Sequence, residues 1–164
     1  MDLLVTLEQS SFSVWVSESG SLLSFPTILL LHTYGMAVLV GIVAAIDLRI
    51  LGFAPAFPFG TLERFLPILW VAFAINAVTG TALLVADATT KLTNPAFQMK
   101  LVFIGLAVVA QRMIETRLLR RPGNAVASFP TSARLLAVAS LVCWLGAITA
   151  GRLLAYVGPV SGLE

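Results

Sequence analysis

Four long apolar segments, separated by short polar ones, dominate the hydropathy pattern of this 164-residue chain. A helix that crosses the hydrocarbon core of a bilayer needs about 20 mostly apolar residues. Segments of that length lie at residues 26–50, 62–86, 95–119 and 132–156. The pattern therefore predicts an all-α membrane protein, a bundle of four transmembrane helices in one domain over residues 23–160.

Helix-start signals support two of these boundaries. Pro26 suits the first turn of the first span, where a missing N–H removes no intrahelical hydrogen bond. Asn94 is a favourable N-cap and Pro95 follows it, so the third span is expected to begin there.

A weaker amphipathic segment precedes the first span. Leu4, Leu7, Val14 and Trp15 recur at helical spacing. A helix with one apolar face lies in the membrane interface rather than across the bilayer. Residues 1–22 are therefore predicted to form an interfacial amphipathic helix.

The distribution of basic residues predicts the orientation of the bundle in the membrane. Lys91, Lys100 and Arg152 lie on the side that holds both termini and the linker after the second span. The opposite side holds seven arginines: Arg49, Arg64, Arg112, Arg117, Arg120, Arg121 and Arg134. Cytoplasmic loops carry the excess of basic residues. The arginine-rich side is therefore predicted to be cytoplasmic, with both termini outside.

Composition narrows the classes of function. Apolar residues make up 59% of the chain and charged residues 11%, against about 25% charged in soluble domains. The net charge of +2 comes from residues placed as topology signals, so the expected partner is the lipid bilayer and not nucleic acid. The chain has no nucleophile elbow, phosphate-binding glycine loop, CxxC or HExxH, and it gives no support to catalysis on its own.

Titratable side chains gather in the outer half of the predicted bundle. His32, the only histidine, lies six residues after Pro26, and an ionisable group inside a membrane is a candidate functional residue. Each of the other spans adds polar groups at a similar depth. The candidate binding residues are His32, Asn76, Asp87, Lys100 and Arg152. The alternative is a structural salt bridge from Asp87 to Lys100 or Arg152.

Two stripes of small residues are predicted to be packing seams, since such residues let membrane helices approach closely. They are Thr33, Ala37, Gly41 and Ala45 on the first span, and Cys143, Ala147 and Gly151 on the fourth. At the cytoplasmic side, Asp47, Arg49, Glu63 and Arg64 are expected to pair across the bundle at the interface.

Several roles are open to His32. A single histidine cannot provide both axial ligands of a haem or a three-histidine metal site. A haem b would need Met99, which lies at the right depth, or His32 of a second copy, because Met36 shares its helix face. Copper would use His32 and Met36, whose nitrogen and thioether donors suit Cu(I). A quinone would need only hydrogen bonds, and a packed neutral histidine would bond to a threonine, an asparagine or a carbonyl.

The chain also resembles a family of small four-span proteins of the bacterial inner membrane. Four segments carry the resemblance: FPTILLLHTYGMAVLVGIVAAIDLRILG, INAVTGTALLVADA, NPAFQMKLVFI and WLGAITAGRLLAY. The matching landmarks are His32, Asp47, Arg49, Gly80, Asp87, Asn94, Lys100, Gly151 and Arg152. The resemblance implies the four-span fold and an inner-membrane location, in which the termini predicted above to lie outside would be periplasmic, but it implies no activity. More distantly, the architecture is similar to cytochrome b561-like and copper-resistance membrane bundles, although the cytochromes use histidine pairs.

Two functions follow from these observations. Nearly all of the chain lies in the membrane, which favours an accessory or structural subunit that packs against other membrane proteins, such as a respiratory or photosynthetic complex, or against a second copy. The alternative is a redox or ligand-binding protein that holds haem b, copper or quinone near His32 on the periplasmic side. In that case Lys100 and Arg152 would hold anionic groups, and Asp87 would orient them.

Overall fold

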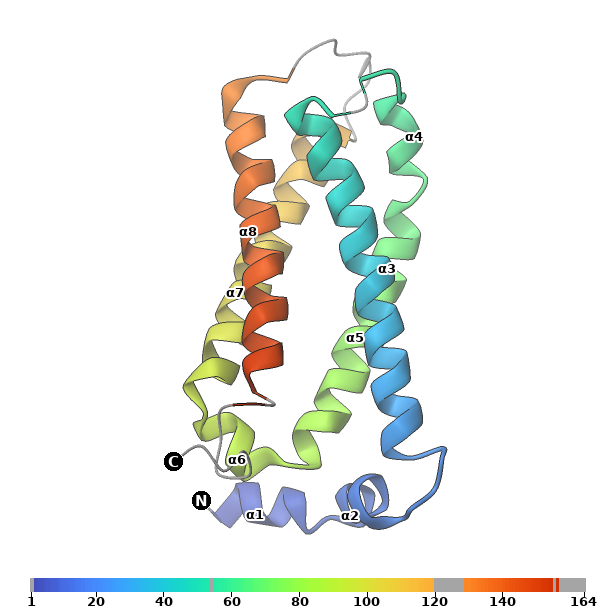
Figure 1. Ribbon diagram of the computed structural model, residues 1–164, viewed down its shortest axis with the longest axis vertical. Coiled ribbons are helices and arrows are strands. Elements are labelled where there is room, and N and C mark those ends of the chain that lie inside the picture. Colours follow the sequence, from blue (N-terminus) through green and yellow to red (C-terminus); the bar gives the residue numbers. More distant parts are fainter. Residues whose placement is uncertain (1, 54, 120–128, 155, 157–164) are drawn as a thin grey trace.

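The computed structural model describes residues 2–53, 55–119, 129–154 and 156. Four long helices run along its long axis (Figure 1): α3 (Phe25–Leu51), α5 (Leu66–Val85), α7 (Pro95–Ile114) and α8 (Thr131–Leu153). The short elements are α1 (Asp2–Glu8), α2 (Ser11–Glu18), α4 (Phe59–Glu63), α6 (Ala88–Thr93) and a π-helical turn, η1 (Glu115–Leu119). Among the described residues, the helical segments long and apolar enough to cross a membrane are four: Phe25–Leu51, Phe59–Val85, Pro95–Leu119 and Thr131–Leu153. The predicted all-α bundle of four spans is confirmed.

Local sequence signals explain where these helices begin. Pro26 lies in the first turn of α3, and the Asn94 side chain accepts a 2.9 Å hydrogen bond from the Ala96 N–H at the start of α7. The second span is not continuous, as α4 ends at Glu63 and α5 starts at Leu66. Pro67 lies in the first turn of α5 and lacks the N–H that an uninterrupted helix would need there.

The four long helices form two pairs. α3 packs along α5 and α7 along α8, and contacts between α3 and α8 join the pairs. We call the end of the bundle with α1, α2 and α6 the α6 end. The arginine-rich end holds Arg49, Arg64, Arg112, Arg117 and Arg134. Arg120 and Arg121, which also entered the orientation argument, lie outside the described residues.

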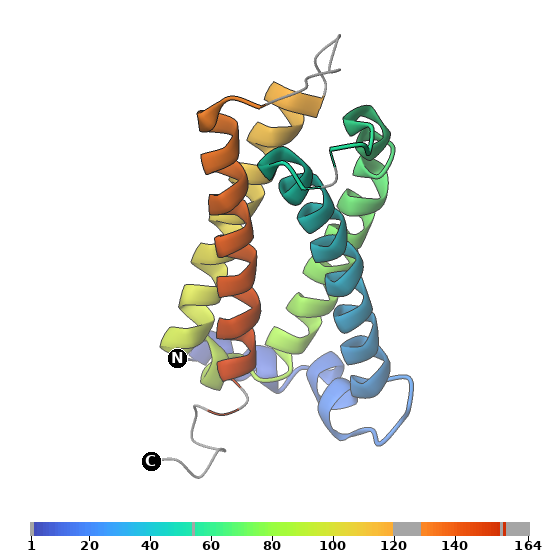
Figure 2. The ribbon, with the colours of Figure 1, turned by 45° about the horizontal axis from the view of Figure 1, so that its top comes forward.

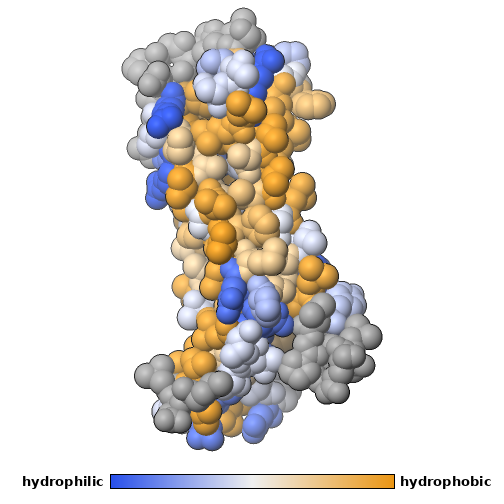
Figure 3. Space-filling view, turned by 90° about the vertical axis from the view of Figure 1, so that its left-hand side faces the viewer, coloured by the Kyte–Doolittle hydropathy of each residue, from blue (hydrophilic) through white to orange (hydrophobic). Residues whose placement is uncertain are grey.

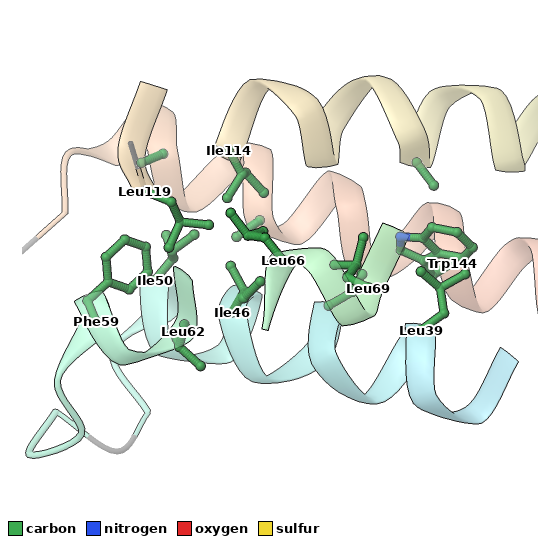
Figure 4. Packing of buried hydrophobic residues seen from close by; sticks show 14 of the residues in the cluster. Leu39, Ile46, Ile50, Phe59, Leu62, Leu66, Leu69, Ile114, Leu119 and Trp144 are labelled. Carbon is green, nitrogen blue, oxygen red and sulfur yellow. The ribbon is translucent and has the colours of Figure 1, made fainter. Parts of the chain in front are cut away.

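The apolar core occupies the middle and the arginine-rich half of the bundle. Ile46 and Ile50 of α3 pack with Leu66 of α5, Ile114 of α7 and Leu119 of η1, all with less than 5% of their surface exposed (Figure 4). The α6 half contains the cavity described below.

The N-terminal segment forms two helices where one was expected. The Ser10 hydroxyl accepts a 3.3 Å hydrogen bond from the Ser13 N–H and so starts a second helix, α2. Both helices run across the end of the bundle (Figures 1 and 2). The Glu8 carboxylate accepts a 2.8 Å hydrogen bond from Thr89 of α6. Trp15 remains exposed on α2, as a helix at the membrane interface requires.

Asp47 and Arg49 do not form the interfacial pairs expected from the sequence. The Arg49 guanidinium donates to the carbonyls of Phe57 (2.8 Å) and Pro55 (3.0 Å) and so holds the loop after α3. Asp47 lies on the inner face of α3 and is fully buried, and neither of its carboxyl oxygens has a hydrogen-bond partner. Two residues along a helix point about 200° apart, so the two side chains cannot share one surface.

A three-residue cluster connects α5 to α7 near the arginine-rich end. The buried Glu115 carboxylate accepts hydrogen bonds of 3.1 Å from Trp70 Nε1 and from Arg112 Nη1. The Arg112 guanidinium also lies 3.6 Å from the centroid of the Trp70 ring. Both partners therefore stabilise the buried negative charge and fix the first turn of η1.

Trp70→Phe should lower the free energy of unfolding by about 1 kcal/mol, because it removes one hydrogen bond to a buried carboxylate while keeping an aromatic ring under Arg112. Thermal unfolding in detergent micelles, followed by circular dichroism, measures this. The matched control is Trp15→Phe, an exposed tryptophan of α2. Equal effects of the two substitutions would contradict the proposed role of the cluster.

Candidate functional site

The contact between α3 and α5 contains two pairs of residues, each made of a glycine on one helix and a polar side chain on the other. A Cβ atom on Gly80 of α5 would lie 3.1 Å from His32 Cε1, and one on Gly35 of α3 would lie 2.8 Å from Asn76 Nδ2. Each helix therefore provides a glycine where the other inserts a polar side chain. Small residues allow transmembrane helices to approach closely, and here the space holds His32 and Asn76.

Hydrogen bonds hold the His32 ring in place. Its Nδ1 lies 3.0 Å from Thr79 Oγ1, and the Thr79 hydroxyl donates to the Ile75 carbonyl at 2.7 Å. A hydroxyl has a single proton, so the bond from Thr79 to Ile75 assigns a neutral His32 ring the tautomer in which Nδ1 donates to Thr79 and Nε2 carries the lone pair. Asn76 Nδ2 donates to the His32 carbonyl at 3.2 Å. The threonine contact expected of a packed neutral histidine is thus present, and the second ring nitrogen stays available.

A cavity lies beside this ring, between all four spans. It has two adjoining lobes, of about 300 and 260 Å³. His32, Met36, Gly80, Lys100 and Ala147 line both lobes. In addition, Lys91, Gly151 and Arg152 line the first lobe, whereas Asn76, Leu101, Ile104 and Trp144 line the second.

Each lobe reaches the surface between two helices. The exposed residues that line the first lobe are Leu29 and Thr33 of α3 and Arg152 of α8. The exposed residues that line the second lobe are Ala77 and Thr81 of α5 and Leu101 of α7. The pairs of long helices that pack extensively are α3–α5, α7–α8 and α3–α8. The seam between α5 and α7 is therefore the least closed, and it lies within the apolar part of the molecule.

Basic side chains dominate the polar lining of the first lobe. The Lys100 stem packs against Gly151, with Cδ and Cε 3.6 Å from the position of a Cβ there. Among the described residues, no acidic side chain lines either lobe, and neither Lys100 nor Arg152 has an ion-pair partner. On the side of α7 and α8, a hydrophilic patch interrupts the apolar belt toward the α6 end (Figure 3).

Asp87 does not form the salt bridge considered from the sequence. Its carboxylate lies 3.7 Å from Lys91 Nζ and not against Lys100 or Arg152. Lys91 also donates to the Leu83 carbonyl at 2.6 Å. Asp87 precedes α6, beyond the end of α5, and so lies outside the cavity lining.

The two candidate methionines are placed differently. Met36 lines both lobes beside His32, whereas Met99 is 56% exposed and lines neither. Within the described part of the chain, no group of three or more histidine, cysteine, aspartate or glutamate side chains could hold a metal ion. The structure therefore brings together His32, Met36, Asn76, Lys100 and Arg152, and leaves Asp87 and Met99 outside.

Sequence reasoning missed how the glycines serve this site. Gly35 lies three residues after His32, and Gly80 lies four residues after Asn76, so each polar residue has a glycine on its own helix face. That reciprocal spacing is a signal that could have indicated the pairing. Thr79, three residues after the candidate residue Asn76, orients the imidazole.

No family model, no curated protein and no solved structure matches the chain. The resemblance to four-span inner-membrane proteins therefore rests on the sequence landmarks alone. The function has to be argued from the site itself.

Proposed function

We propose that the protein binds a lipid-soluble ligand in the cavity around His32. The observation that supports this most strongly is the cavity itself, which has apolar walls from all four spans and a few convergent polar groups, as small-molecule sites do. The polar groups also lie where a ligand from the bilayer could reach them.

The open imidazole nitrogen suits each ligand expected from the sequence. A quinol hydroxyl could donate to His32 Nε2. A haem b iron or a copper ion could be coordinated by that nitrogen, with Thr79 orienting the ring from the other side. Met36 could add a thioether donor to copper, and a haem would need a further protein ligand from another copy of the chain.

The proposed location is a bacterial inner membrane, with the arginine-rich end in the cytoplasm and the termini in the periplasm. The positive-inside rule supports this orientation, since Arg49, Arg64, Arg117 and Arg134 lie at that end. The cavity then opens in the periplasmic half of the bilayer.

Ala147→Phe tests the proposal because Ala147 lines both lobes and a phenyl ring there would fill the space between them. Native mass spectrometry of the protein released from mild detergent should show a bound small molecule on the wild type and none on this variant. Ala139→Phe, on the exposed side of the same helix, should keep the ligand. Retention by Ala147→Phe, or a wild type without any ligand, would refute the proposal.

A second candidate, the accessory subunit, is favoured by one observation. Thr33, Ala37, Gly41 and Ala45 all lie exposed on α3, so this stripe is not a seam within the chain. A hollow of about 440 Å³ adjoins it, lined in part by Gly41, Ala45, Phe57 and Phe65. A helix of another membrane protein, or of a second copy, could pack closely there.

Gly41→Leu should abolish such an association without affecting the fold, because a Cβ at Gly41 meets no atom within 4 Å. Crosslinking in native membranes, followed by gel electrophoresis, would show a partner or a dimer lost in this variant. Val38→Leu, on another exposed part of α3, is the control. A crosslinking pattern unchanged by Gly41→Leu would exclude this surface.

A further inference from the structure

The first lobe has an unbalanced charge. Lys91, Lys100 and Arg152 line it, and no carboxylate does so among the described residues. Lys91 is already neutralised by Asp87 at 3.7 Å. Among the described residues, Lys100 at the wall and Arg152 at the rim of this lobe are therefore left without a carboxylate partner.

The Lys100 side chain is only partly exposed and packs along the cavity wall. It lies five residues after Pro95, roughly 8 Å along the helix at 1.5 Å per residue. Its stem is held against Gly151, with Nζ 3.7 Å from the position of a Cβ there. A half-buried ammonium at that depth needs a partner or hydration, and its packing directs it along the cavity wall.

Arg152 complements Lys100 from the neighbouring helix. It follows Gly151, the residue against which Lys100 packs, and it is exposed at the rim of the same lobe. A guanidinium binds carboxylate and phosphate oxygens through paired N–H groups. One acidic headgroup could thus accept hydrogen bonds from both side chains.

The second lobe is suited to an apolar chain. Leu101, Ile104 and Trp144 contribute to its wall, and it adjoins the first lobe at Lys100 and His32. An acidic headgroup at the α6 end and an apolar tail toward the middle of the membrane would follow the orientation of the surrounding lipid.

We propose that the ligand is an anionic amphiphile, whose carboxylate or phosphate headgroup binds between Lys100 and Arg152 and whose acyl chain enters the second lobe. This inference rests on the proposed function, and it selects one chemistry from those that His32 alone would permit. A neutral quinone or a copper ion would leave both cations without a counter-charge.

Quenching of Trp144 fluorescence by brominated acyl chains tests this, because the indole lines the second lobe. Purified protein in non-ionic detergent is titrated with dibrominated stearate, brominated phosphatidylglycerol and brominated phosphatidylcholine, with a Trp144→Phe variant to define the signal. At least one of the two anions should bind about tenfold more tightly than the neutral phosphatidylcholine. Tighter binding of stearate than of phosphatidylglycerol indicates that the ligand is a free fatty acid. The reverse order of affinities indicates a phospholipid.

Arg152→Gln and Lys100→Gln should each weaken binding of the preferred anion by about tenfold, while Arg134→Gln at the other end should not. Arg152 is exposed, so its variant should keep the fold even if Lys100→Gln does not. Equal binding of anionic and neutral lipids, or no effect of Arg152→Gln, would overturn the inference. If the ligand that Ala147→Phe removes from the cavity proves to be neutral, the proposed function still stands. Only the anionic headgroup is then refuted.

Discussion

Gly35→Ala should lower the free energy of unfolding by about 2 kcal/mol, although the same change inside a helix ordinarily raises it by about 0.5–1 kcal/mol. A Cβ at this position would lie 2.8 Å from Asn76 Nδ2 and 3.4 Å from the Ala72 carbonyl oxygen. The Asn76 amide would have to move, and it would lose its hydrogen bond to the His32 carbonyl. Thermal unfolding in detergent micelles provides the measurement.

Two further variants separate this steric cause from a general sensitivity of helix glycines. Gly105→Ala in α7 places a Cβ where no atom lies within 4 Å, so it should be neutral or stabilising. In an Asn76→Ala background the main clash is gone, and Gly35→Ala should lose most of its effect. A penalty that stays the same with and without Asn76 would contradict the proposed pairing of Gly35 with Asn76.

The spans could be predicted because their signals are local. Hydropathy over about 20 residues identifies a membrane helix whatever surrounds it. The start of α7 follows from Asn94 and Pro95 alone. The break before α5 follows from Pro67 and was available to the same reasoning.

Which face of each helix points into the bundle and which points outward could not be predicted in the same way. The stripes around Gly41 and Ala147 look alike in the sequence, yet Gly41 faces outward and Ala147 lines the cavity. In a soluble protein, apolarity would distinguish the inner face from the outer one. In a membrane, lipid and protein interior are equally apolar, so the pattern loses that information.

The same limit explains why only part of the candidate site could be predicted from the sequence. The depth of each residue follows from its position in a span, and His32, Lys100 and Arg152 do lie around one cavity. Rotation about the helix axis does not follow from depth. Met99 and Lys100 share one depth, but adjacent residues point 100° apart, so only Lys100 reaches the cavity.

Asp47→Asn should raise the free energy of unfolding by about 2 kcal/mol, which is unusual for a buried position. The Asp47 side chain is fully buried between the spans, and neither carboxyl oxygen has a hydrogen-bond partner. The Ser140 hydroxyl of α8 lies near it without meeting hydrogen-bond geometry. Burying a carboxylate without partners costs several kcal/mol more than burying an amide of the same shape, so the neutral side chain should be tolerated better.

Asp87→Asn is the matched control at the α6 end, where a partly exposed carboxylate loses a 3.7 Å ion pair with Lys91. Such pairs contribute less than about 1 kcal/mol, so this variant should be nearly neutral or slightly destabilised. Both variants are compared by unfolding in the same detergent. If Asp47→Asn instead destabilises the bundle, the carboxylate must hold a bound water or cation between α3 and α8, and Ser140→Ala should then cause a similar loss.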